Sequence, residues 1–247
     1  MKESNRKHSR GTGAALTFII GILLVMLLLP KRQEALPTTK FNLQEALSEK
    51  EQLIDYVISE QYTYAIVSTT VDKIYGDRFL VLAKQENVWK RIYENDFSGL
   101  KPWKLEVADV DGDGKKDIIT AVRKKTYYDK EEKNRLFLFN YLDKTLVKKW
   151  TGSDIAGNWE NFVVGELVDT KGEELIFISK TAERKKKLFV YHWFDFGFLL
   201  LAEGEAYEDI IEVEILKENC LLLTYQKGKE QKELLRLKEG KVTEVRN

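Results

Sequence analysis

From residue 52 to the C-terminus, short apolar runs alternate with charged turns. The runs are about four to eight residues long and rich in Val, Ile, Leu, Phe and Tyr, which is typical of β-strands. They form four sets of four that repeat about every 50 residues, and such a period indicates a repeat architecture. We expect strands at 52–58, 64–68, 79–83, 87–93, 104–110, 117–122, 135–141, 145–150, 162–168, 174–179, 188–194, 198–204, 209–215, 220–225, 233–238 and 241–246.

The connections between the runs repeat as well. In each set a charged loop follows the second run and a short polar turn follows the third. Each set therefore predicts a four-stranded antiparallel meander, which cannot bury both of its faces alone and has to stack on its neighbours. Serial meanders of this size favour an all-β domain of four propeller-like blades. A β-sandwich with similarly spaced strands is the alternative.

A different pattern occupies the N-terminus, where residues 11–30 carry no charge. As a helix, these twenty residues span about 30 Å, the thickness of a bilayer's hydrocarbon core. Four cations precede the run and two follow it closely, which favours a cytoplasmic N-terminus. A cleaved signal peptide is the alternative, but no small-x-small cleavage pattern follows the run. We therefore expect an uncleaved, single-pass transmembrane anchor.

The anchor implies four regions and a location in the cell membrane. The chain has 40 basic and 40 acidic residues, of which six bases and one acid lie in residues 1–32. The remainder carries 34 bases and 39 acids, about −5 net, which argues against nucleic acid as a partner. The regions are a cytoplasmic tail at 1–10, the transmembrane anchor at 11–30, a stalk or linker at 31–51 and an extracytoplasmic domain at 52–247.

An Asp-rich segment separates the first two runs of the second set. It reads DVDGDGKKD, with carboxylates at its first, third, fifth and ninth positions. Carboxylates spaced in this way supply oxygen ligands to a hard divalent cation from one tight loop, and Gly114 at the sixth position permits the sharp turn. The expected metal ligands are Asp109, Asp111, Asp113, Asp117 and the backbone carbonyl of Lys115.

The loop departs from an EF-hand, because Thr120 stands at position twelve, where a glutamate would be needed. The phrase KLEVADVDGDGKKDIITAV, residues 104–122, resembles the calcium loops of FG-GAP and VCBS repeats in integrin-α propellers and bacterial surface proteins. This resemblance implies one Ca²⁺ bound by the five ligands named above. The matching segments of the other three sets lack the spacing, so we expect them to be metal-free turns.

The resemblance does not decide whether the four blades close into a ring. FG-GAP propellers usually have seven blades, whereas this chain has length for four. A closed four-bladed propeller, an open array and closure through oligomerisation are the alternatives.

The sequence contains no GxSxG, Walker, HExxH or CxxC motif. Trp103 and Trp159 precede first runs, where we expect them to pack in the core rather than form a ligand platform. We therefore expect a non-enzymatic binding or scaffold protein, anchored in the membrane, whose partner outside the cell is a protein or a glycan. The alternative is a surface hydrolase that cleaves wall glycan through paired carboxylates.

Overall fold

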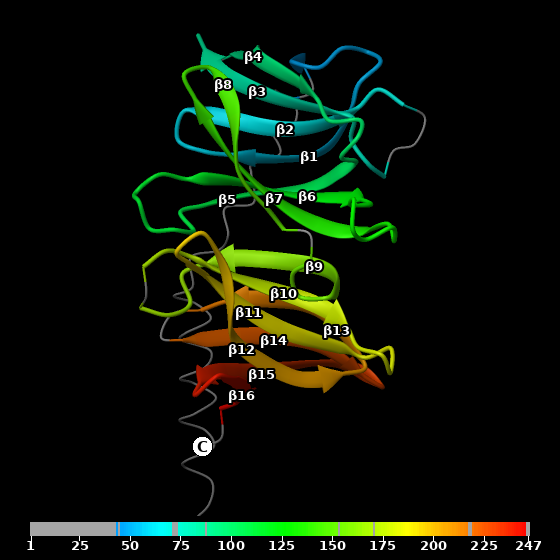
Figure 1. Cartoon of the computed structure of the whole chain (residues 1–247), viewed down its shortest axis with the longest axis vertical. Helices are drawn as coiled ribbons and strands as arrows, with labels where there is room; N and C mark the ends of the chain where they lie inside the picture. The colour runs from blue at the N-terminus through cyan, green and yellow to red at the C-terminus, as the bar shows by residue number, and fades with distance from the viewer. Residues whose placement is uncertain are drawn as a thin grey trace, which may run out of the picture. The chain divides into compact units, whose positions relative to one another are not determined.

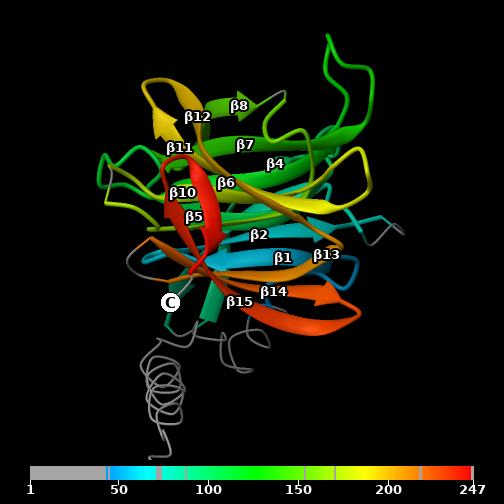
Figure 2. The same cartoon turned by 90° about the horizontal axis from the view of Figure 1, so that it is seen from below.

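The computed structural model describes residue 43 and residues 45–245, apart from 71–73, 87, 153, 170 and 217–218. The described part contains sixteen β-strands in sheets of four, four and eight strands (Figures 1 and 2). The predicted all-β class is confirmed. Every predicted strand range overlaps an observed one, and consecutive strands of each set pair antiparallel, as a meander requires.

The first two sheets are separate meanders. The first has the order β1-β2-β3-β4 and the second β5-β6-β7-β8. Their strands are β1 (Gln52–Ile58), β2 (Tyr62–Ser68), β3 (Arg78–Gln85), β4 (Val88–Asp96), β5 (Pro102–Ala108), β6 (Asp117–Lys124), β7 (Lys133–Leu142) and β8 (Thr145–Gly152).

The last two meanders join into one sheet, with the order β13-β14-β15-β16-β12-β11-β10-β9. The strands are β9 (Asn158–Gly165), β10 (Glu174–Lys180), β11 (Lys186–Phe194), β12 (Gly197–Tyr207), β13 (Asp209–Ile215), β14 (Cys220–Lys227), β15 (Lys229–Lys238) and β16 (Lys241–Glu244).

Four separate blades were expected, so this junction is a correction to the sequence-based fold. It is a short parallel pairing of β12 with β16, in which Glu203 and Gly204 face Lys241 and Val242. The Glu203 amide also donates to the Gly240 carbonyl at 3.2 Å. The junction forms on the edge of β12 that faces away from β11, where unpaired backbone groups are satisfied by β16.

Apolar faces hold successive meanders together. On β6, Ile118 packs in a cluster shared with the first sheet, whereas Ile119 packs in a cluster shared with β9 and β10. A strand covered on both faces needs a continuous apolar run, which explains the segment DIITAV. Between the meanders, β1 contacts β5, β5 contacts β9, and β9 contacts β13. A third cluster fills the space enclosed by the eight-stranded sheet.

Residues 43–51, part of the predicted stalk, pack on the first sheet. Leu43 is buried, and Ala46 and Leu47 contact the same apolar cluster on the face of this sheet that points away from β5. Glu51 accepts a hydrogen bond from the Ser48 amide at 2.8 Å and pairs with Arg91 on β4 at 2.5 Å. The compact unit therefore begins at residue 43.

The predicted tail and transmembrane anchor, residues 1–30, lie outside the described residues. Within the described part of the chain, no helix is long and apolar enough to cross a membrane.

Candidate metal site

The Asp-rich loop joins β5 to β6 and gathers three of the predicted ligands. One carboxylate oxygen each from Asp109, Asp111 and Asp113 lies within 4.8 Å of the other two. Oxygens bound to a single Ca²⁺ at about 2.3–2.6 Å lie within roughly 5 Å of one another. The spacing of these three oxygens therefore fits one hard cation, and the oxygen chemistry of the donors fits calcium.

The backbone of the loop winds around Asp109. Its carboxylate accepts hydrogen bonds from the amides of Asp113 at 3.0 Å and Gly114 at 2.8 Å, and Asp113 accepts one from the Lys115 amide at 2.8 Å. Gly114 has a φ of 85°, in the left-handed region that glycine adopts without strain. The tight turn predicted at Gly114 is thereby confirmed.

A second loop, between β9 and β10, holds the first in place. The Glu173 amide donates to the Asp109 carbonyl at 2.9 Å, and the Asp109 amide donates to the Glu173 carboxylate at 3.0 Å. A Cβ on Gly172 would lie 2.2 Å from the Val110 carbonyl oxygen, so the close approach requires glycine. Glu173 could not be predicted from the sequence, because the contact joins residues 64 positions apart.

Asp117, the fourth predicted carboxylate, is placed apart from the cluster. It is fully buried at the start of β6, where it accepts hydrogen bonds from Asn140 at 2.7 Å and from Lys149 at 2.7 and 2.9 Å. The same ammonium contacts Asp111 at 2.7 Å. Lys149 therefore links the Asp-rich loop to Asp117, and its positive charge neutralises part of the negative charge of the Asp cluster.

The charges around Lys149 influence one another. Burial opposes ionisation of Asp111, but the hydrogen bond and charge of Lys149 outweigh it and lower the pKa of Asp111. Burial also disfavours the charged form of Lys149, yet Asp111 and Asp117 together raise its pKa. Burial raises the pKa of Asp117 in spite of its donors. Because Lys149 stays charged at neutral pH, the buried carboxylate has a fixed counter-charge.

An aromatic hairpin borders the Asp-rich loop. A groove of about 440 Å³ is lined by Asp111, Lys171 and residues 192–195, at the end of β11 and the start of its turn to β12. On this hairpin Phe194 is 64% exposed and Phe196 81%. The Trp193 indole donates to the Asp195 carbonyl at 2.9 Å. These phenylalanines were not predicted as functional residues, although the segment WFDFGF is unusually rich in aromatic residues.

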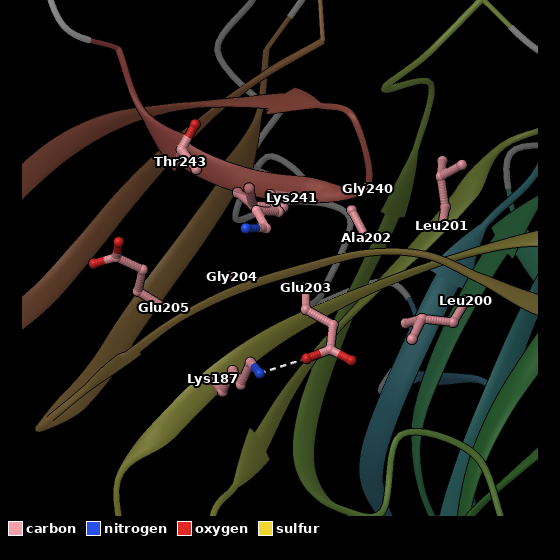
Figure 3. Close-up of a pocket in the computed structure, with 11 residues that line it drawn as sticks. Lys187, Leu200, Leu201, Ala202, Glu203, Gly204, Glu205, Gly240, Lys241 and Thr243 are labelled. Carbon is pink, nitrogen blue, oxygen red and sulfur yellow. Dashed lines mark hydrogen bonds and ion pairs between the residues drawn. The ribbon is translucent and has the colours of Figure 1, made fainter.

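Two further cavities lie where β12 meets β15 and β16. The first, of about 460 Å³, is shown in Figure 3, where Lys187 and Glu203 form an ion pair within its lining. The second, of about 470 Å³, has Glu205, Glu233 and Glu244 in its lining. Burial, followed by the charge of Glu244, raises the pKa of Glu233. The lining of the second cavity also contains Arg236 and Lys238, so its three carboxylates share the cavity with two cations.

Comparisons with known proteins assign no family. No family model matches the chain, and no curated protein matches it. Among solved structures, a candidate 6-phosphogluconolactonase from Bacteroides uniformis has a TM-score of 0.48 and 12% identity over 79% of this chain. A type IV secretion system related protein from Xanthomonas has a TM-score of 0.37 and 16% identity, covering 81% of this chain and 96% of that one.

A second candidate 6-phosphogluconolactonase, from Bacteroides fragilis, has a TM-score of 0.38 and 9% identity, covering 77% of this chain and 68% of that one. This chain spans 54% of the length of the Bacteroides uniformis protein. Similarities of this size carry no functional assignment.

Proposed function

We propose that the protein is a membrane-anchored, extracytoplasmic, calcium-binding protein with a β-propeller-like domain that acts as a binding or scaffold module. The observation that carries this proposal is the convergence of Asp109, Asp111 and Asp113 on one point of a loop that the neighbouring meander holds in place. The uncharged run at residues 11–30 supports the anchor.

Calcium fits this loop better than magnesium. Its ligands are carboxylates on a short, solvent-facing turn, and Asp113 is exposed, so water can complete a shell of six to eight oxygens. Magnesium requires near-ideal octahedral geometry at shorter distances, which a loop with its donors spread in this way does not impose. The ion would have a structural role, since it would offset the repulsion among the three carboxylates.

The exposed aromatic hairpin beside the loop supports a binding role. A group of neighbouring, solvent-exposed apolar side chains marks an interaction surface more often than a single exposed apolar side chain does. Phe194 and Phe196 lie on the hairpin that lines a groove with Asp111. A protein or a glycan with an apolar face is the partner class we propose for this surface.

Thermal melting of the full chain in neutral detergent, with calcium and with a chelator, tests the proposal. At calcium concentrations about 100 times Kd, binding to the folded state alone adds about 2.7 kcal/mol, so we expect a clear rise in Tm. Asp113→Asn should remove most of that rise, because it deletes a ligand charge without breaking an ion pair present in the described structure. Asp143→Asn, on an exposed turn between β7 and β8, is the matched control. Equal melting with calcium and chelator would contradict calcium binding, and an equal rise with magnesium would contradict the choice of metal.

A carboxylate-based hydrolase is the second candidate function, favoured by the raised pKa of Glu233 beside Glu244. In glycoside hydrolases a carboxyl group with a raised pKa acts as the general acid. Release of reducing ends from purified wall glycan, lost in both Glu233→Gln and Glu244→Gln, would establish this activity. No release by the full chain would reject it.

The same glutamate predicts a pH dependence of stability. Because burial in the folded chain raises the pKa of Glu233 above its ordinary value of 4.5, the folded state binds this proton more tightly than the unfolded state does. The contribution of Glu233 to the free energy of unfolding is therefore fully present below pH 4.5. It declines as the pH rises through the folded-state pKa of Glu233. We expect Glu233→Gln to gain in Tm relative to the wild type between pH 4.5 and pH 7.5. Glu230→Gln, an exposed position on the same strand, should show no such gain.

A further inference from the structure

A fourth concave site, a groove, lies on the second meander, far in sequence from the aromatic hairpin described above. Its volume is about 550 Å³, within the range of small-molecule sites. Phe137 and Phe139 of β7 contribute apolar surface, and Lys124, Lys125 and Lys148 contribute positive charge. None of the described residues that line it is acidic.

The acids nearby in sequence are bound to other cations. On the loop between β6 and β7, Asp129 pairs with Arg135 at 2.7 Å and also contacts Lys133. Glu131 pairs with Lys133 at 3.1 Å, and Glu132 pairs with Lys101 at 2.7 Å.

None of these ion pairs involves Lys124, Lys125 or Lys148, the three lysines that line the groove. Glu132 lies within electrostatic range of Lys125, but its hydrogen-bonded partner is Lys101. In the described part of the chain, Lys124, Lys125 and Lys148 therefore have no carboxylate in ion-pair contact. Three positive charges around one concave, partly apolar surface produce a local positive potential. This potential is local, because residues 33–247 as a whole carry more acidic than basic residues.

Local contacts hold two polar residues of the groove, Lys124 and Thr126, in place. The Lys124 ammonium lies 5.5 Å from the centre of the Phe137 ring, within cation–π range. The Thr126 amide donates to the Asp129 carbonyl at 2.8 Å, and the Thr126 hydroxyl accepts from the Asp129 amide at 2.9 Å. That hydroxyl keeps its own proton for donation. Next to it, Tyr127 is 79% exposed.

We propose that this groove binds a phosphate ester. Its phosphate would lie among Lys124, Lys125 and Lys148, and its organic part would pack on Phe137 and Tyr127. A phosphate monoester carries about −1.5 to −2 charges at pH 7, so it matches three cations better than a carboxylate does. Lysine is a common point-charge partner of phosphate. The proposal is independent of the calcium loop, because the two sites share no residue.

Binding of glycerol 1-phosphate to the full chain in neutral detergent, followed by calorimetry, tests the proposal. We expect saturable binding that inorganic phosphate displaces, that weakens with salt, and that acetate does not reproduce. The double variant Lys124→Gln/Lys148→Gln should weaken binding at least about tenfold. The matched control is Lys84→Gln/Lys90→Gln, which removes two exposed lysines of the first sheet and should bind as the wild type does.

The outcomes separate the sources of the phosphate. Binding of glycerol 1-phosphate that inorganic phosphate displaces supports a soluble phosphate ester as the ligand. Binding that appears only when phosphatidylglycerol is mixed into the micelles supports the phosphate of a lipid headgroup instead. Failure of every phosphate probe to bind the wild type overturns the proposal, as does equal weakening in the control variant. If the double variant melts below the wild type, Lys125→Gln alone replaces it.

Discussion

Replacing Trp159 with alanine is expected to lower the free energy of unfolding by about 3–5 kcal/mol, the usual cost of removing a large aromatic side chain from a core. Trp159 is 1% exposed. Its ring centre lies 6.0 Å from that of Trp103, 5.9 Å from that of Phe162 and 5.2 Å from that of Phe177. Because this cluster joins the second meander to the third, the cavity would weaken the junction between them. Denaturant unfolding followed by tryptophan fluorescence measures the loss.

Trp159→Phe is the control for this prediction. The indole nitrogen of Trp159 is buried with no hydrogen-bond acceptor in the structure, and an unpaired buried donor is itself costly. Phenylalanine removes that group and keeps most of the apolar contact. We therefore expect Trp159→Phe to be much less destabilising than Trp159→Ala. An alanine variant as stable as the wild type would show that this cluster does not support the fold.

The bounds of β1 (Gln52–Ile58) and β13 (Asp209–Ile215) were predicted without error, and those of two strands covered on both faces nearly so. The expected range 174–179 became Glu174–Lys180, and 117–122 became Asp117–Lys124. The first strands of two sets were predicted too far along the chain, since 104–110 became Pro102–Ala108 and 162–168 became Asn158–Gly165. The start of β9 was not predicted because polar residues surround Trp159. The residues after Gly165 belong to the loop between β9 and β10, which contacts the Asp-rich loop through Glu173.

In the candidate site, features that depend on spacing within one loop were predicted, whereas contacts between residues far apart in the sequence were not. The convergence of Asp109, Asp111 and Asp113 and the turn at Gly114 could be predicted, because their geometry depends on spacing within one loop. Lys149, Asn140 and Glu173 could not, because each reaches the loop or Asp117 from another strand or loop. The parallel pairing of β12 with β16 was hidden for a similar reason: it involves backbone groups, which carry no side-chain pattern.

Lys149→Met is expected to cost about 3–5 kcal/mol in the absence of calcium, because removal of one partner from a buried ion pair leaves the other charge uncompensated. Asp117 is fully buried and Lys149 is 17% exposed, so solvent screens the pair weakly. In the variant, Asn140 would be the remaining side-chain donor to Asp117 among the described contacts. Melting of the full chain with a chelator present measures the loss.

The double variant Asp117→Asn/Lys149→Met separates the charge effect from the loss of packing. It leaves no buried charge at this position, so we expect it to recover much of the stability that Lys149→Met loses. If the double variant is no more stable than Lys149→Met, the loss comes from packing of the lysine stem.

Calcium should act more strongly on Lys149→Met than on the wild type. In the wild type the Lys149 ammonium contacts Asp111 at 2.7 Å and repels a cation that approaches the loop. Without it, Asp111 and Asp117 lose their shared positive partner, and a bound divalent ion becomes the nearest source of positive charge. We therefore expect the rise in Tm caused by calcium to be larger in Lys149→Met than in the wild type. An equal or smaller rise would show that Lys149 does not compete with the metal, and would place the cation away from the oxygen of Asp111 that this lysine contacts.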